Sequence, residues 1–343
     1  MYKLKVITYK LLINILLRLP DFFYSFLFAI AFPVYKAIHT ERAYGRVEKH
    51  LDAAREYLAT QDEDCAPGLN SAPGLNCASG LNGAASGLNC AGPLQKVTAR
   101  DMFRGIFWNA LDSYRGLARF KSVERRIVFE NEGIIKDAVA ECAKIGMPIA
   151  GISIHQGSFE LMHRALCRYS EHVHLITDSV GDVAFRDVLA ELRSDPHLTE
   201  YHPEETGRLI RELFRTKGIL AMVYDQGKNT KGNTVELFGK QTTLYLRLIE
   251  KINRMGAGIV TFRTWTEMRG SPSRDSKYPE GSIVIRFETF YPPKYDETVA
   301  GKAASQAGES ALVKDIARET ERWIAEHPDQ WSWNYHGNFI THP

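Results

Sequence analysis

The sequence lacks a strong excess of charge of either sign, and it lacks the cysteine patterns of metal-binding or disulfide-rich proteins. Its 43 Lys and Arg residues nearly balance 41 Asp and Glu residues, so composition does not favour a nucleic-acid partner. None of the five cysteines forms a C-x-x-C pair. We therefore predict no zinc site, no metal, no disulfide framework and a reducing compartment.

Two groups of well-known motifs are also missing. No G-x-G-x-x-G follows a predicted strand and no G-x-x-x-x-G-K-[ST] occurs, which excludes the nucleotide-binding folds that depend on them. Ser153 and Ser158 flank His155 without a G-x-S-x-G elbow, which disfavours a serine hydrolase. No cofactor is predicted. The 343 residues suffice for one large domain with appendages.

Residues 6–35 form the most apolar part of the chain. In the first half, Lys10, Asn14 and Arg18 make one polar stripe, a pattern typical of a helix that lies in a membrane interface. The second half, residues 22–35, is expected to end near Pro33 and is shorter than the roughly 20 residues of a straight span. An interfacial anchor, a spanning helix and a buried helix pair all remain open. Basic residues flank both sides, so orientation is not predicted.

Three regions follow from these patterns. Residues 1–40 are predicted to be a membrane anchor. Residues 41–100 combine an amphipathic helix with an imperfect A-[PS]-G-L-N repeat, which holds three cysteines and cannot bury enough apolar surface to fold. Residues 101–343 alternate helical and strand patterns, which predicts an α/β domain with a mixed central sheet flanked by helices.

The most informative stretch is residues 148–168. An apolar strand over 148–154 delivers His155 to the end of a sheet, where ligands bind in open α/β folds. Glu160 falls in the helix expected to follow, with Ser158 as its N-cap. We expect Glu160 to face His155 and hold its second nitrogen, because a neutral imidazole held in this way is a general base near pH 7. A surface or structural ion pair is the alternative.

Other candidates surround this pair. Asp225 and Gln226 follow the strand predicted over 218–224, at the same edge, where Asp225 either orients a catalytic group or caps a turn. Backbone N–H groups near Gly157, or the side chain of Arg193, are candidates to stabilise an oxyanion. Thr243, expected before a helix, is a further candidate to present N–H groups to an anion.

Four motifs occur in a fixed order between residues 102 and 343. They are His155-Gln-Gly-Ser-Phe-Glu160, Asp225-Gln226, Leu237-Phe238-Gly239 followed by Thr242 and Thr243, and His327-Pro-Asp-Gln-Trp-Ser-Trp333. In this order the chain resembles the late-acting lipid A (lauroyl/myristoyl) acyltransferases. That family shares an H-x-x-x-x-[DE] motif with the glycerolipid acyltransferases.

The resemblance implies a membrane enzyme that moves an acyl group from acyl carrier protein or acyl-CoA to a hydroxyl or amine of a membrane lipid. The implied acceptor is a lipid A precursor, and the implied place is the bilayer surface on the cytoplasmic face of a bacterial inner membrane. His155 and Glu160 would be catalytic. The residues after Trp333 are not basic, unlike the family's usual tail, so an ornithine- or inositol-mannoside-type acceptor stays open, as does a non-catalytic lipid-binding protein.

Overall fold

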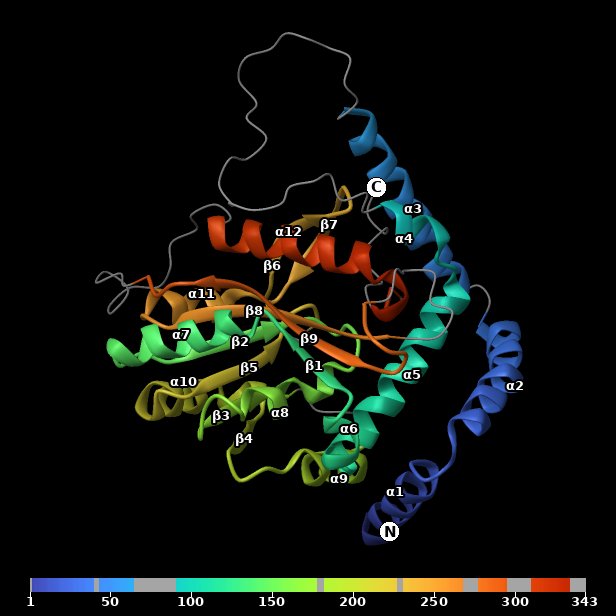
Figure 1. The fold of residues 1–343 in the computed structure, drawn as a ribbon, viewed down its shortest axis with the longest axis horizontal. Helices are drawn as coiled ribbons and strands as arrows, with labels where there is room; N and C mark the ends of the chain where they lie inside the picture. The colour runs from blue at the N-terminus through green and yellow to red at the C-terminus, as the bar shows by residue number, and fades with distance from the viewer. Residues whose placement is uncertain are drawn as a thin grey trace.

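A seven-stranded sheet runs through the centre of the molecule, with helices on both faces (Figure 1). This arrangement comes from a computed structural model that describes residues 2–39, 43–64, 91–177, 182–226, 231–267, 277–294 and 310–333. The predicted α/β class with a mixed central sheet flanked by helices is confirmed, and the sheet is mostly parallel. Most of the A-[PS]-G-L-N repeat, including its three cysteines, lies outside the described residues.

The strands of the sheet have the spatial order β1-β9-β8-β2-β5-β3-β4. From β8 to β4 all neighbours are parallel, whereas β9 runs antiparallel to β8 and parallel to β1. A separate antiparallel hairpin joins β6 to β7. The bounds are β1 Ile127–Glu130, β2 Ile149–Ser153, β3 Val173–Ile176, β4 Leu198–Tyr201, β5 Ile219–Val223, β6 Asn233–Leu237, β7 Lys240–Leu244, β8 Gly258–Thr266 and β9 Ile283–Tyr291.

Helices form a long N-terminal region before the first strand and also most of the connections between the strands. Their bounds are α1 Tyr2–Leu16, α2 Asp21–His39, α3 Gly45–Asp64, α4 Ala91–Lys96, α5 Ala99–Ala118, α6 Phe120–Glu124, α7 Glu132–Lys144, α8 Met162–Leu166, α9 Val183–Arg193, α10 Thr206–Thr216, α11 Arg247–Arg254 and α12 Ala311–Glu326. A capping box between Thr98 and Asp101 fixes the start of α5, the longest of the helices that pack near the sheet edge.

Alternating side chains of the strands divide the core between the two faces of the sheet. Ile152 and Met222 point to the face covered by α10, α11 and α12, and side chains of α3 and α4 join this cluster. Phe262 and Phe287 point to the opposite face, against α7 and α8. The central strands are buried on both faces, which is why they read in the sequence as continuous apolar runs.

Helices α1 and α2 lie along one side of the molecule, outside α5 (Figure 1). Tyr24, Phe28 and Phe32 of α2 pack on α5, and Arg115 of α5 pairs with Asp21 at 2.7 Å. The predicted end of the second helix near Pro33 is wrong, because α2 continues through this proline to His39. By length and composition α2 is the one described helix that could cross a membrane.

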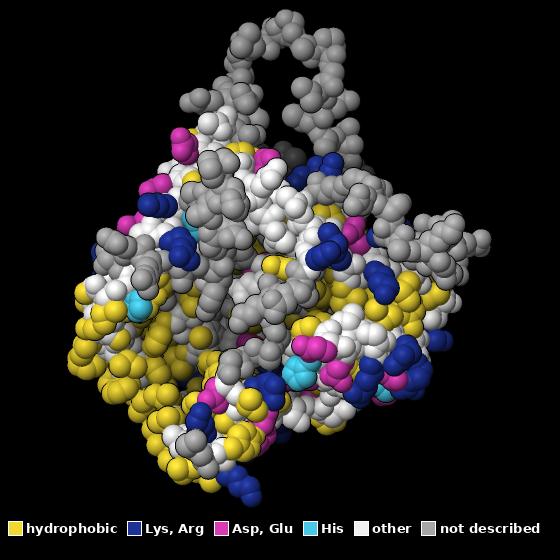
Figure 2. Space-filling model, turned by 180° about the vertical axis from the view of Figure 1, so that it is seen from behind, with side chains coloured by type: hydrophobic (Ala, Val, Ile, Leu, Met, Phe, Trp, Pro, Cys, Tyr) yellow, Lys and Arg dark blue, Asp and Glu magenta, His cyan; other side chains and the backbone are white. Residues whose placement is uncertain are grey.

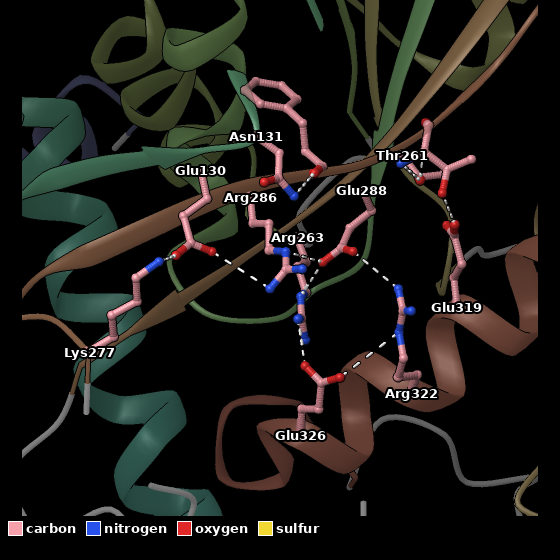
Figure 3. A network of polar contacts seen from close by, with 12 residues as sticks. Glu130, Asn131, Thr261, Arg263, Lys277, Arg286, Glu288, Glu319, Arg322 and Glu326 are labelled. Carbon is pink, nitrogen blue, oxygen red and sulfur yellow. Dashed lines mark hydrogen bonds and ion pairs between the residues drawn. The ribbon is translucent and has the colours of Figure 1, made fainter. Parts of the chain in front are cut away.

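A network of charged side chains, some of them buried, links α12 to β8 and β9 of the sheet (Figure 3). Arg263 of β8, which is 2% exposed, pairs with Glu288 of β9 at 2.7 Å and with Glu326 of α12 at 2.5 Å. Arg322 of α12 also reaches Glu288, at 3.1 Å. A polar cavity of about 540 Å³ opens beside this network, and each cation of the network that lines it has a carboxylate partner. We assign this network a structural role in holding α12 against β8 and β9, because removal of one partner would leave an uncompensated buried charge.

Sequence patterns missed two edge strands and misplaced several boundaries. The apolar spacing of residues 130–144 predicts one helix, but α7 begins only at Glu132, because residues 127–130 pair with β9 as β1. Helical patterns over residues 182–193 and 204–216 leave no strand predicted between them, where the structure has the edge strand β4. Thr242 and Thr243 belong to the β6–β7 hairpin, and α11 begins at Arg247, so Thr243 does not offer N–H groups at a helix start.

Replacing Phe262 by Ala should test the α7–α8 side of the core. The Phe262 ring is fully buried, so Phe262→Ala should lower the free energy of unfolding by about 3–5 kcal/mol. Ile145→Ala is the control, since Ile145 is 56% exposed and its loss should cost less than about 0.5 kcal/mol. Denaturant unfolding measures both variants, and equal losses would contradict the assignment of Phe262 to the core.

Candidate active site

Strand register brings His155 and Asp225 together, although they are far apart in the sequence. Strands β2 and β5 are parallel neighbours, with Ser153 opposite Val223. The backbone continues for two residues beyond this pair in each strand, so His155 and Asp225 meet at the carboxyl ends of the strands. The sequence-predicted edge site therefore contains both residues.

The His155 imidazole is held by the Asp225 carboxylate. Its Nδ1 lies 2.7 Å from Asp225 Oδ1, and the same oxygen accepts the His155 backbone N–H at 3.0 Å. A carboxylate accepts hydrogen bonds and does not donate them, so we assign the proton to Nδ1 and leave Nε2 with a lone pair. The Asp225 side chain is fully buried, whereas that of His155 is 21% exposed. This arrangement suits a general base that reaches an external proton.

Phe159 limits the motion of the imidazole. Its ring centroid lies 4.5 Å from that of His155, in an edge-on arrangement. Phe159 opens the 3-10 turn η2 (Phe159–Leu161), which replaces the start of the predicted helix. Ser158 does not cap a helix through its side chain, because its hydroxyl lies 3.3 Å from the Thr266 hydroxyl instead.

Glu160 does not have the role that its spacing predicted. Its two carboxylate oxygens accept hydrogen bonds from Arg193 Nε at 2.9 Å and Nη2 at 2.7 Å, which makes a bidentate pair. The partner of His155 Nδ1 is Asp225, not Glu160. Glu160 lies inside the 3-10 turn η2 and not in the continuous α-helix that the prediction assumed, so its side chain leaves the backbone in a different direction.

The Glu160–Arg193 pair is a charged element beside the imidazole. Burial alone would raise the pKa of Glu160, but the Arg193 guanidinium outweighs this effect and leaves the pKa of Glu160 lowered. Glu200 of β4 lies 4.0 Å from Arg193 Nη1, and burial raises the pKa of Glu200. The charge of Arg193 is thus already neutralised by Glu160. Arg193 would stabilise an oxyanion, as predicted from the sequence, only if its guanidinium bound the oxyanion and Glu160 at the same time.

The predicted backbone donor at Gly157 is occupied. The Gly157 N–H donates to the Gln330 carbonyl at 3.1 Å, so it is not available for an oxyanion in this structure. Gly157 has φ +59°, and a Cβ there would lie 2.4 Å from the Thr264 carbonyl oxygen. The position requires glycine because the loop runs directly against β8. Gln226 follows Asp225 and is half-buried.

The C-terminal motif closes the site from the side of β8. Trp331 Nε1 donates to Asp225 Oδ2 at 3.0 Å, and Trp331 forms an antiparallel bridge with Gln156. The Gln330 side-chain amide exchanges two hydrogen bonds of 2.7 Å with the backbone of Thr266. The motif at residues 327–333 marks this segment as one of interest in the sequence, but nothing in the sequence indicates which residues it contacts.

The described residues contain no group of three or more His, Cys, Asp or Glu side chains placed to hold a metal ion. Comparison with models of protein families gives no match to this chain, and comparison with curated proteins gives none either. A function for this chain must therefore be inferred from the geometry of the site.

A buried histidine next to this site predicts how stability depends on pH. His163 of α8 is 1% exposed, and burial lowers its pKa to about 4 from 6.5. The unfolded chain binds the His163 proton more tightly than the folded chain does. The contribution of neutral His163 to the free energy of unfolding should therefore be fully present above about pH 6.5 and should fall as the pH drops toward 4. His174, buried in β3, has a pKa lowered to about 4 by the same cause and adds to this fall.

Replacing His163 by Gln should flatten this dependence. Between pH 7 and pH 4 the free energy of unfolding of His163→Gln should fall by about 3 kcal/mol less than that of the wild type. The reason is that Gln does not titrate, so this position no longer binds protons differently in the folded and unfolded states. Denaturant unfolding at several pH values measures the slope. The exposed His197 provides the control His197→Asn, and an unchanged slope in His163→Gln would contradict the argument.

Proposed function

We propose that this protein is a membrane-associated acyltransferase. The observation that carries the proposal is the His155–Asp225 pair at the carboxyl edge of the sheet, in a molecule whose N-terminal helices expose apolar side chains. His155 Nε2 would take the proton from an attacking hydroxyl or amine, and Asp225 would stabilise the imidazolium that forms. General-base catalysis of this kind contributes about 10²- to 10⁴-fold.

The exposed apolar surface supports a membrane location for the acceptor. Figure 2 shows hydrophobic side chains gathered along the side that α1 and α2 occupy. Phe22, Phe26 and Ile30 of α2 are 74%, 62% and 54% exposed, and Leu4 and Ile7 of α1 are 66% and 62% exposed. Single exposed apolar residues are common, but a continuous surface of this kind marks a membrane or protein partner.

Helix α5 connects this surface with the site. Aromatic side chains of its N-terminal half pack on α2, as in the contact between Phe107 and Phe28. Its C-terminal half packs on η2, where Gly116 adjoins Leu161 of the turn that begins with Phe159. A lipid that enters from the side of α2 would therefore approach the loop that bears His155.

The proposed donor and acceptor come from the resemblance of the four ordered motifs. An acyl thioester, on acyl carrier protein or coenzyme A, supplies a carbonyl that the nucleophile attacks as His155 takes its proton. The C–S bond then breaks, and the leaving thiolate receives that proton from the His155 imidazolium. A lipid A precursor on the cytoplasmic face of a bacterial inner membrane is the acceptor that we propose, by resemblance of the four ordered motifs. Among the described residues, no observation favours a purely lipid-binding role over catalysis.

Removing the base should abolish transfer without unfolding the protein. His155→Ala and Asp225→Asn in the full-length protein, reconstituted with membrane lipids, should each lower acyl transfer by about 10²- to 10⁴-fold. The assay follows labelled acyl groups from acyl carrier protein and from acyl-CoA into lipid, with the products identified by mass spectrometry. The exposed His197→Ala serves as the matched control. Wild-type turnover by His155→Ala would refute the proposal, and lipid binding without any transfer by the wild type would favour a binding protein.

A further inference from the structure

A second pocket lies between α2 and α5, away from His155. It encloses about 360 Å³ and combines apolar with charged walls. The lining residues are Ser25, Phe28 and Ala29 of α2, with Arg100, Asp101, Arg104 and Trp108 of α5.

The charges of this pocket favour an anion. Its lining has two guanidinium groups and one carboxylate, and the Asp101 carboxylate already accepts hydrogen bonds from the Thr98 backbone N–H and hydroxyl at 3.0 and 2.6 Å. Arg100 and Arg104 are one helical turn apart in the first turns of α5, where the helix dipole also favours negative charge. Guanidinium groups bind phosphate with paired hydrogen bonds, so a phosphate ester fits these groups.

The packing of α2 determines how this pocket meets a bilayer. Phe32 contacts Phe103, and Tyr24 contacts Trp108, so α2 lies along α5 over most of its length. A perpendicular span of α2 would carry the charged residues Arg100 and Arg104 into the hydrocarbon, which is costly. With α2 in the plane of the interface, its exposed residues meet acyl chains while the pocket remains at headgroup depth.

We propose that this pocket binds the phosphate of an anionic phospholipid headgroup, with the lipid's acyl chains against the exposed face of α2. The site would hold α1 and α2 flat in one leaflet. The proposal rests on the membrane location within the proposed function but not on acyl transfer, so binding tests it independently of activity.

Vesicle binding by the full-length protein tests this site. Replacing both arginines, Arg100→Gln with Arg104→Gln, should reduce the preference for phosphatidylcholine vesicles containing phosphatidylglycerol over pure phosphatidylcholine vesicles by about tenfold or more, since each cation contributes near the surface. Arg211→Gln with Lys251→Gln removes the same charge from exposed positions of α10 and α11 and should leave the preference unchanged. If the Gln pair unfolds, Arg100→Lys with Arg104→Lys should keep the charge and most of the preference.

Equal losses in the pocket and control pairs would overturn the proposal, because they would show a general charge effect. Inorganic phosphate is added as a competitor at constant ionic strength. It should reduce the preference of the wild type for phosphatidylglycerol, because it competes with the headgroup phosphate for the same guanidinium groups. An undiminished preference at high phosphate concentration would also overturn the proposal.

A separate observation concerns the buried face of Asp225. Its Oδ1 faces His155, while Oδ2 accepts the indole N–H of Trp331 at 3.0 Å. Charged groups near the imidazole include Asp225 itself and Glu160, which pairs with Arg193 and interacts electrostatically with His155. Tyr224 precedes Asp225, and burial raises its pKa. The indole is thus a neutral donor that both orients the carboxylate and withdraws charge from it.

We infer that Trp331 is a positioning residue for the His155 base, a role that rests on the proposed function. Without the indole N–H, the Asp225 carboxylate would carry more of its charge on the oxygen that faces His155. The imidazolium would then be favoured, and a smaller fraction of His155 would be the free base at a given pH.

Trp331→Phe should lower kcat with little change in KM and move the acidic limb of the pH–rate profile upward by about one pH unit. Trp333→Phe is the matched control, since Trp333 is equally buried and donates its indole N–H to the Pro328 carbonyl at 2.8 Å. It should not move the limb. A shift in both variants, or in neither, would overturn the role of Trp331.

The histidine titration of His155, followed by NMR, gives the same comparison without activity. An upward shift of its midpoint in Trp331→Phe and none in Trp333→Phe would support the positioning role even if acyl transfer itself failed. An unchanged midpoint in Trp331→Phe would contradict it.

Discussion

The rest of the site depends on the parallel pairing of β2 with β5. This register, and no local motif, sets His155 against Asp225, and the Asp225 carboxylate then binds the imidazole and the backbone of the same histidine. A slip by one residue would turn each side chain to the other face of the sheet. Burial of both strands on both faces prevents such a slip, so the packed core defines the geometry of the base.

Charge compensation is the second constraint, and it is met in the same way at two places in the sheet. Near β4, Arg193 is shared between Glu160 and Glu200. Near β9, Arg263 is shared between Glu288 and Glu326. Both guanidinium groups sit between two carboxylates, which limits the cost of removing charge from water. Only the first lies beside the imidazole, so only there can rearrangement of the pair affect chemistry at the site.

Much of the fold can be predicted from the sequence, and the reasons for success and failure are physical. The apolar run over residues 148–154 predicts β2 nearly to the residue, and the helical apolar spacing of residues 311–326 predicts α12 in the same way. The edge strands β1 and β4 are short and half exposed, so their patterns carry little signal. The end of α2 is misjudged because a proline inside a helix can be tolerated where the helix packs on a neighbour.

At the site, spacing locates the correct segments but gives the wrong partner. Strand patterns place His155 and Asp225 at one edge, and a role for Asp225 in orienting a catalytic group is among the expectations. The preference for Glu160 depends on a continuous helix after Ser158, whereas the chain forms a 3-10 turn. The contacts of Trp331 and Gln330 are tertiary, across more than a hundred residues for Asp225, and no local pattern encodes them.

The hydrogen bonds that Gln330 and Trp331 make with the Gly157 loop, β8 and Asp225 also have a consequence for biosynthesis. The apolar helices α1 and α2 are synthesised before the sheet that carries the site, and chains fold progressively during translation. The loop at Gly157 and the carboxylate of Asp225 gain their last partners only when residues 330 and 331 have been made. If the protein is the proposed membrane-associated acyltransferase, its attachment to the membrane would precede the completion of the His155–Asp225 site.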